Sequence, residues 1–124
     1  MGQFYIDHIA LLVKDVEESE KSMPADLVRN QVERFEAEGT KEQYLTSDAD
    51  HSGSILLMQP VGDGPYKRAM AKRGPGLHHI CIKVGSLSKF IAEIANSGFL
   101  LHPYTLESMK HGTAYFCRPG IGFC

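Results

Sequence analysis

Two short apolar runs, each opening on histidine, dominate the hydrophobic pattern of this chain. The first covers residues 7–13, and the second follows the glycines of residues 74–76. When His8 is superposed on His79, apolar residues coincide at most of the positions that follow. Both runs have the length and branched side chains of strands, and the glycines predict that the second strand covers Ile80–Val84 with its histidines at the mouth. The repeat indicates an internal duplication.

The rest of the pattern completes two similar modules. Asp15 and Ser86 follow the two histidine runs and are suited to cap helices. We expect helices over residues 16–23, 66–73 and 87–97, with a further helical turn over 25–28, and strands over 4–13, 31–35, 42–47, 54–60, 80–84, 99–101, 113–117 and 121–124. This order predicts an α+β fold of two βαβββ modules that share one sheet. Module one spans about residues 4–61 and module two about residues 75–124 of a single domain.

Composition and charge exclude several classes of function. The 124 residues suffice for one domain, and 43% hydrophobic with 23% charged residues is ordinary for a globular protein. A net charge of -2 provides no electrostatic footprint for nucleic acid or an anionic membrane. No apolar run approaches the roughly 20 residues of a membrane span, and no signal peptide is visible. Cys81, Cys117 and Cys124 have no zinc-site spacing, and reduced thiols in a cytoplasmic protein are the expectation.

Four segments carry a resemblance to a known family. They are Asp7-His8-Ile9-Ala10, Ile55-Leu56-Leu57-Met58-Gln59-Pro60, the stretch from Lys72 to Val84 with Gly76-Leu77-His78-His79-Ile80-Cys81, and His111-Gly112. In these segments the sequence resembles the vicinal oxygen chelate superfamily, also called the glyoxalase or bleomycin-resistance fold, and within it the methylmalonyl-CoA epimerases. The resemblance implies two βαβββ modules that form one curved sheet around a cleft. It also implies a divalent metal in that cleft, held by one ligand from each of four strands.

The resemblance assigns the ligands only in part. It puts the first at His8 and the third at His79, while the second position is occupied by Leu56 and the fourth, a carboxylate, would follow Cys124. A leucine side chain cannot coordinate a metal, and two histidines are fewer ligands than such sites normally use. Gln59 lies three positions from Leu56, on the opposite face of a strand, and is no substitute. We therefore expect a degenerate site with weak or no divalent metal, and no catalytic residue is assigned.

Other polar residues are expected to have no role in this site. His78 should point away from His79, as a surface or dimer-contact residue. Glu36 and Glu38 fall where such epimerases can carry a second carboxylate, but a solvated acidic turn is the simpler interpretation. The segment 48–53 has the composition of a solvated loop without calcium-loop spacing, and His51, His102 and His111 fall in loops.

Three functions remain open from the sequence. The first is an isomerase, epimerase or lyase that acts on a small acyl or oxo substrate. The second is a metal-free protein that binds or sequesters a small molecule, such as an acyl-CoA or another acyl compound. The third is a structural or partner-binding copy of the fold. In each case we expect no nucleic-acid or membrane partner, and we expect a homodimer, because unpaired edge strands can be covered by a second subunit.

Overall fold

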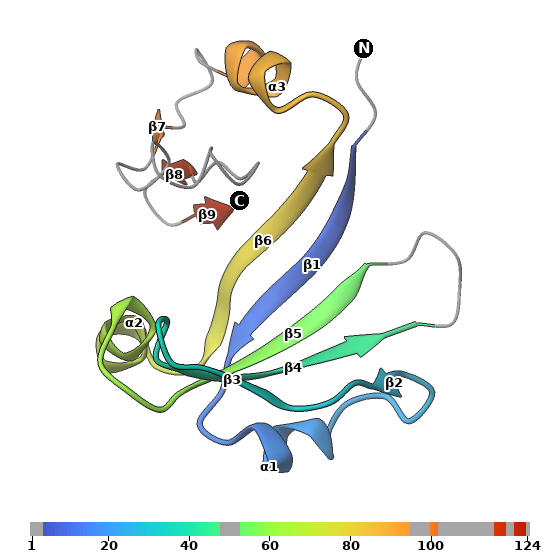
Figure 1. Ribbon diagram of the computed structural model, residues 1–124, viewed down its shortest axis with the longest axis vertical. Coiled ribbons are helices and arrows are strands. Elements are labelled where there is room, and N and C mark those ends of the chain that lie inside the picture. Colours follow the sequence, from blue (N-terminus) through green and yellow to red (C-terminus); the bar gives the residue numbers. More distant parts are fainter. Residues whose placement is uncertain (1–3, 48–52, 95–99, 102–115, 119–120, 124) are drawn as a thin grey trace. The chain divides into compact units, whose positions relative to one another are not determined.

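The computed structural model describes residues 4–47, 53–94, 100–101, 116–118 and 121–123. These residues form nine strands and three helices (Figure 1). In chain order they are β1 (Phe4–Leu12), α1 (Val16–Glu20), β2 (Val28–Arg29), β3 (Glu33–Phe35), β4 (Thr40–Thr46), β5 (Ser54–Pro60), α2 (Pro65–Arg73), β6 (Gly76–Val84), α3 (Leu87–Ile94), β7 (Leu100–Leu101), β8 (Phe116–Arg118) and β9 (Ile121–Phe123). The predicted mixture of strands and helices is confirmed, and β6, α3, β7, β8 and β9 follow the βαβββ order.

The chain divides into two compact units, residues 8–78 and residues 1–7 with 79–124. In the unit of residues 8–78 the strand order is β2-β4-β5-β1, and β3 also pairs with β4. There β1 runs parallel to β5, whereas β4 is antiparallel to β2, β3 and β5. In the other unit β9 lies between β6, to which it is parallel, and β8, which pairs in turn with β7. β1 and β6 each pass from one unit into the other.

The sheet of the unit 8–78 is apolar on both faces. On one face Val13, Leu45 and Leu57 form a buried cluster with Val16 of α1. The opposite face, called here the His8 face, carries His8 and a second buried cluster that consists of Ala10, Leu12, Leu56 and Met58. Tyr44, Tyr66, Ala69 and Met70 pack against this second cluster. The part of β1 in this unit therefore has a buried cluster on each side of the sheet.

Local polar contacts set the start of α1. The Asp15 side chain accepts a hydrogen bond from the Glu18 N–H at 2.9 Å, which confirms the predicted cap. Gln59 Oε1 accepts a further bond from the Val16 N–H, also at 2.9 Å. Gln59 thus lies on the α1 side of the sheet, opposite to Leu56, as the strand alternation predicts. Its amide has a structural partner and is not placed to replace a metal ligand on the His8 face.

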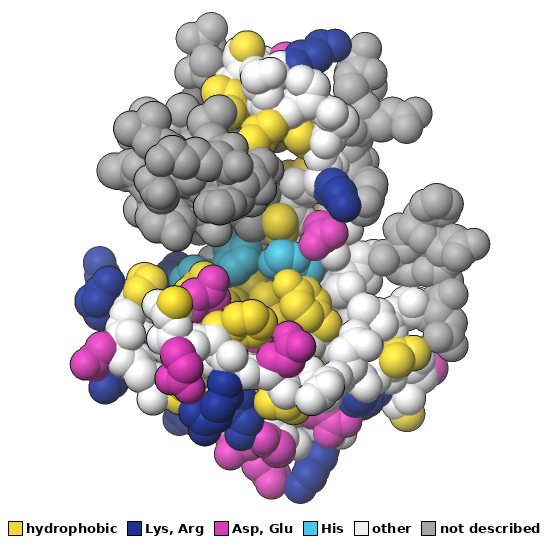
Figure 2. Space-filling model, in the orientation of Figure 1, with side chains coloured by type: hydrophobic (Ala, Val, Ile, Leu, Met, Phe, Trp, Pro, Cys, Tyr) yellow, Lys and Arg dark blue, Asp and Glu magenta, His cyan; other side chains and the backbone are white. Residues whose placement is uncertain are grey.

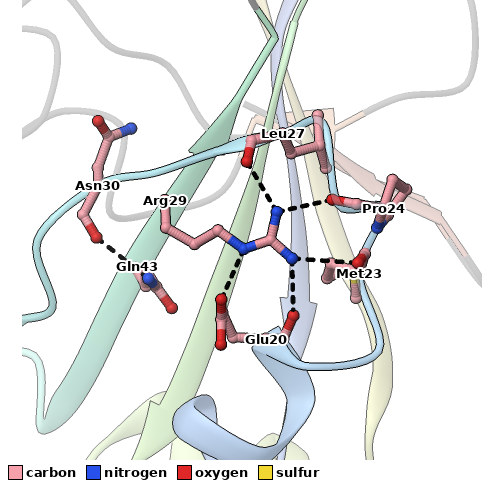
Figure 3. A network of polar contacts seen from close by, with 7 residues as sticks. All are labelled: Glu20, Met23, Pro24, Leu27, Arg29, Asn30 and Gln43. Carbon is pink, nitrogen blue, oxygen red and sulfur yellow. Dashed lines mark hydrogen bonds and ion pairs between the residues drawn. The ribbon is translucent and has the colours of Figure 1, made fainter.

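Arg29 organises the segment between α1 and β2 (Figure 3). Its guanidinium donates to the Glu20 carboxylate at 2.6 Å. It also donates to four main-chain carbonyls at 2.6 to 3.1 Å, those of Glu20, Met23, Pro24 and Leu27. The predicted helical turn over residues 25–28 is wrong, because these carbonyls turn toward one side chain and Val28–Arg29 forms β2. For the same reason α1 ends at Glu20 rather than at Met23.

A glycine turn precedes β4. Gly39 has a φ of 69° and its carbonyl accepts hydrogen bonds from the N–H groups of Val61 and Gly62 at 2.9 and 3.2 Å. A Cβ at this position would lie 2.7 Å from the Asp63 carbonyl oxygen. Only glycine fits this close approach at a positive φ. The contact joins the start of β4 to the chain that leads from β5 into α2.

The second histidine strand is longer than predicted. β6 begins at Gly76 rather than at Ile80, so His78 and His79 lie inside the strand and not at its mouth. α3 follows, and the Ser86 side chain accepts from the Lys89 N–H at 3.4 Å, as predicted for its cap. No helix in the described part of the chain is long and apolar enough to span a membrane. The predicted loop at 48–52, the three histidines His51, His102 and His111, and Cys124 lie outside the described residues.

Candidate functional site

His8 lies near one end of the buried cluster on the His8 face. Its side chain is 9% exposed, and its ring contacts the Tyr44 ring edge-to-face with centroids 5.7 Å apart. The strand register places Ala10 and Tyr44 on either side of Leu56. His8 and Leu56 therefore share a face of neighbouring strands, two residues apart along the register. The coordination role of His8 stays a prediction.

Leu56 is a packing residue. It is 3% exposed and belongs to the buried cluster with Ala10, Leu12 and Met58. An alkyl side chain offers no lone pair to a metal, and its neighbours in this cluster offer only apolar carbon and a thioether. The residues present at this position therefore do not fit the ligand set that the resemblance implies.

Glu42 is a buried carboxyl on the same face, and sequence reasoning missed it. It is 6% exposed, pairs across the strands with Met58, and accepts a hydrogen bond from the Thr40 hydroxyl at 2.5 Å. Burial is the main cause that raises the pKa of Glu42 to about 7, and Glu38 and Glu33 add to the rise while the Thr40 hydrogen bond opposes it. The group changes its charge near neutral pH. In the sequence, alternation placed Glu42 on the same strand face as Tyr44, but nothing marked that position as buried.

The turn that contains Glu36 and Glu38 agrees with the predicted solvated acidic turn. Glu36 and Glu38 are both exposed, and the Glu38 N–H donates to the Phe35 carbonyl within the turn. Sequence reasoning considered these two glutamates and passed over Glu42, which is the buried one. Because the turn side chains are exposed, neither provides the desolvated environment that Glu42 has.

His78 lies against α2. It is half-buried, and its ring packs on the Tyr66 ring with centroids 4.9 Å apart. Burial, and after it the positive charge of Arg73, lower the pKa of His78. His78 is thus less exposed than the predicted surface position, because the Tyr66 ring of α2 packs on it, and the dimer-contact alternative stays a prediction. The Tyr66 ring thus contacts His78 and packs against the cluster that contains Leu56.

His79 belongs to the unit formed by residues 1–7 and 79–124, where it is half-buried in β6. Its convergence with His8 on one metal stays a prediction. In this same unit the Asp7 carboxylate and the Cys81 thiol lie within 4.8 Å of each other. Both are residue types that bind metals, and sequence reasoning took Cys81 only as a buried thiol.

Figure 2 shows how side chains of each kind are distributed on this side of the molecule. In the unit of residues 8–78, hydrophobic side chains gather beside histidine, and acidic and basic side chains surround them. The half-buried Tyr44, Tyr66 and Met70 are at the margin of the buried cluster. Apolar residues with a few polar groups at their margin are typical of the lining of small-molecule sites.

Comparison with protein families gives one match over most of the chain. A model described as the Glyoxalase/Bleomycin resistance protein/Dioxygenase superfamily matches residues 7–116. No curated protein matches the sequence significantly.

Solved structures extend the match to nearly the whole chain. A hypothetical protein from Bacillus halodurans C-125 aligns with a TM-score of 0.74 and 22% identity, covering 98% of this chain and 91% of that one. Methylmalonyl-CoA epimerase from Mycobacterium tuberculosis aligns with a TM-score of 0.72 and 18% identity, covering 96% and 84%. A methylmalonyl-CoA epimerase in complex with methylmalonyl-CoA and NH4+ aligns with a TM-score of 0.70 and 20% identity, covering 96% and 90%. At these identities the likeness confirms the predicted glyoxalase-like α+β fold.

Proposed function

Because this chain belongs to the Glyoxalase/Bleomycin resistance protein/Dioxygenase superfamily, we propose that it binds a small acyl or oxo compound at the His8 face without a tightly held divalent metal. The burial of Leu56 in an apolar cluster, at the position where the resemblance expects a ligand, is the observation that carries this proposal. Similar structures contain methylmalonyl-CoA or 2-nitronate-propionyl-CoA, which supports an acyl thioester as the ligand class.

The chemistry of the face suits an acyl group better than a metal ion. The half-buried Tyr66 and Met70 provide apolar contact over the buried cluster, while His8 and Tyr44 provide ring nitrogen and hydroxyl groups at one end. A ligand of this kind gains from apolar burial and is oriented by a few polar contacts. A divalent ion would instead need several nitrogen, oxygen or sulfur ligands around it.

Elemental analysis and calorimetry test the proposal together. The purified, dialysed protein should contain substoichiometric zinc, cobalt, nickel and manganese. Titration with methylmalonyl-CoA should give the same affinity with and without a chelator. Leu56→Glu should gain thermal stability on addition of cobalt or zinc, relative to Leu56→Met as the apolar control, if the family geometry holds. Stoichiometric metal that resists dialysis would contradict the metal-free proposal, and its loss in Cys81→Ser would assign it to the Asp7 and Cys81 pair.

Glu42 favours a second candidate, an isomerase or lyase acting on the same ligand class. A carboxyl with a pKa near 7 is a suitable group to remove or return the proton of a carbon acid at neutral pH. Incubation of an acyl-CoA in deuterated water would show exchange of the proton at the carbon next to the thioester carbonyl. The exchange should be absent in Glu42→Gln and retained in the exposed-turn control Glu36→Gln. If the unmodified protein shows no exchange either, the result favours the binding function over the isomerase or lyase function.

A further inference from the structure

α2 concentrates positive charge in a chain whose net charge is negative. Its nine residues contain four cations, namely Lys67, Arg68, Lys72 and Arg73, and no acidic residue, while the whole chain has a net charge of -2. All four side chains are exposed. The basic side chains at the left of Figure 2 gather where Figure 1 places α2.

The two sides of α2 differ. Tyr66, Ala69 and Met70 pack against the buried cluster of the His8 face. At about 100° per residue, Lys67, Arg68 and Lys72 fall on the side away from these three residues. Arg73 falls on the packed side, next to His78. We call Lys67, Arg68 and Lys72 the outer basic face of α2.

Most of this charge is not neutralised within the described part of the chain. Lys67 pairs with Asp63 at 3.3 Å, and both of these side chains are largely exposed. Arg68 and Lys72 form no ion pair with a described residue. An exposed pair of the Lys67 kind is weak and exchanges readily with another anion. The outer basic face is therefore available to a negatively charged group.

Helix stability does not explain all of these cations. Lys72 in the last turn interacts favourably with the helix dipole, but Lys67 and Arg68 lie in or beside the first turn, where the dipole favours acidic residues. Asp63, just before the helix, pairs with Lys67, but no acidic residue in the first turn and no side-chain cap offsets Arg68. The placement of Arg68 at this end therefore costs stability unless it binds something else.

We propose that the outer basic face of α2 binds the phosphate groups of a coenzyme A thioester whose acyl end lies on the His8 face. This inference depends on the proposed function for the acyl end. α2 connects the two regions, because its inner side packs on the cluster that contains Leu56 and its outer side presents the cations. A helix is about 10–12 Å across with its side chains, so a ligand that contacts both sides needs a long flexible arm between them, as a phosphopantetheine arm is. Lysine and arginine are the side chains that recognise phosphate.

Calorimetry with three probes tests the inference on the full chain. The probes are coenzyme A, adenosine 3′,5′-bisphosphate as its nucleotide end, and an acyl pantetheine that lacks the nucleotide. The test variant is Lys67→Glu/Arg68→Glu/Lys72→Glu, and the control is Lys14→Glu/Lys21→Glu/Arg34→Glu, which reverses three exposed charges elsewhere. Coenzyme A and the bisphosphate should bind at least about tenfold more weakly to the α2 variant, and more weakly in high salt. Acyl pantetheine should bind equally to the unmodified protein, the α2 variant and the control variant.

The outcomes separate this inference from the proposed function. If the α2 variant and the control bind coenzyme A alike, the inference is overturned. It is also overturned if a single-stranded oligonucleotide or an anionic phospholipid vesicle binds the outer basic face as tightly as coenzyme A, since the surface would then attract polyanions in general. If acyl pantetheine does not bind the unmodified protein, the proposed function fails. Loss of bisphosphate binding in the α2 variant would still support a phosphate site on this helix.

Discussion

Replacement of Glu42 by glutamine should change how the stability of this protein depends on pH. Glu42 is 6% exposed, and its pKa is raised from the ordinary 4.5 to about 7. Between these two values the folded protein binds more protons than the unfolded chain. The contribution of this group is therefore fully favourable below about 4.5 and is lost as the pH rises through about 7.

The size of the effect follows from the shift. A shift from 4.5 to about 7 corresponds to about 3 kcal/mol at 1.36 kcal/mol per pKa unit. Glutamine keeps a carbonyl oxygen for the Thr40 hydroxyl but cannot become charged. At pH 8.5 we expect Glu42→Gln to be more stable than the unmodified protein by up to about 3 kcal/mol, and at pH 4.5 we expect nearly equal stability.

Urea denaturation at half-unit intervals between pH 4.5 and 8.5 measures this difference. Other groups also titrate in this range, so the informative quantity is the unfolding free energy of the variant minus that of the unmodified protein. Glu36→Gln, on an exposed turn, is the control for removing a glutamate charge without removing a buried one. Parallel stability curves for Glu42→Gln and the unmodified protein would refute the reasoning, because the carboxyl would then titrate alike in the folded and unfolded states.

Four further predictions concern structure and assembly. Arg29→Met should lower the unfolding free energy by about 3 kcal/mol in urea denaturation, because four main-chain carbonyls and a carboxylate each lose their hydrogen bond from the guanidinium. Arg29→Lys should recover only part of this free energy. Gly39→Ala should lower the melting temperature by an amount equivalent to more than about 1 kcal/mol, whereas Gly85→Ala, an exposed position where an added Cβ meets nothing within 4 Å, should have a smaller effect. Asp15→Ala should cost about 1 kcal/mol by the same assay, and Asp15→Ser much less. Sedimentation velocity at micromolar concentration should detect a homodimer; a monomer throughout would contradict it.

The elements with strong hydrophobic patterns could be predicted from sequence, because apolar residues recur in them at the period of a strand or a helix. Residues 54–60 and 87–94 are a strand and a helix within the predicted segments. β2 was not predictable, because it depends on contacts that Arg29 makes with carbonyls up to nine residues earlier. The start of β6 was misplaced because Gly76, which usually marks a turn, is its first residue with a φ of 141°.

The candidate site was predictable only where a resemblance named a position. His8 and Leu56 share a sheet face, which alternation could establish once both strands were assigned. Glu42 could not be singled out, since its raised pKa depends on how many side chains cover it and on the approach of Glu33 and Glu38. The closeness of Asp7 and Cys81 was likewise invisible, because 74 residues separate them in the sequence.

The boundary between the two compact units has a consequence for how the chain can be cut. The sequence repeat starts a new copy at the second histidine strand, yet the first seven residues belong to the same unit as residues 79–124. The repeat in the sequence and the compact units therefore divide the chain at different residues. A fragment ending at Gly74 would contain one complete copy of the repeat and still lack residues 79–124 of the unit to which its first seven residues belong. Expression of the two copies as separate fragments should yield stable protein only when both are present and associate.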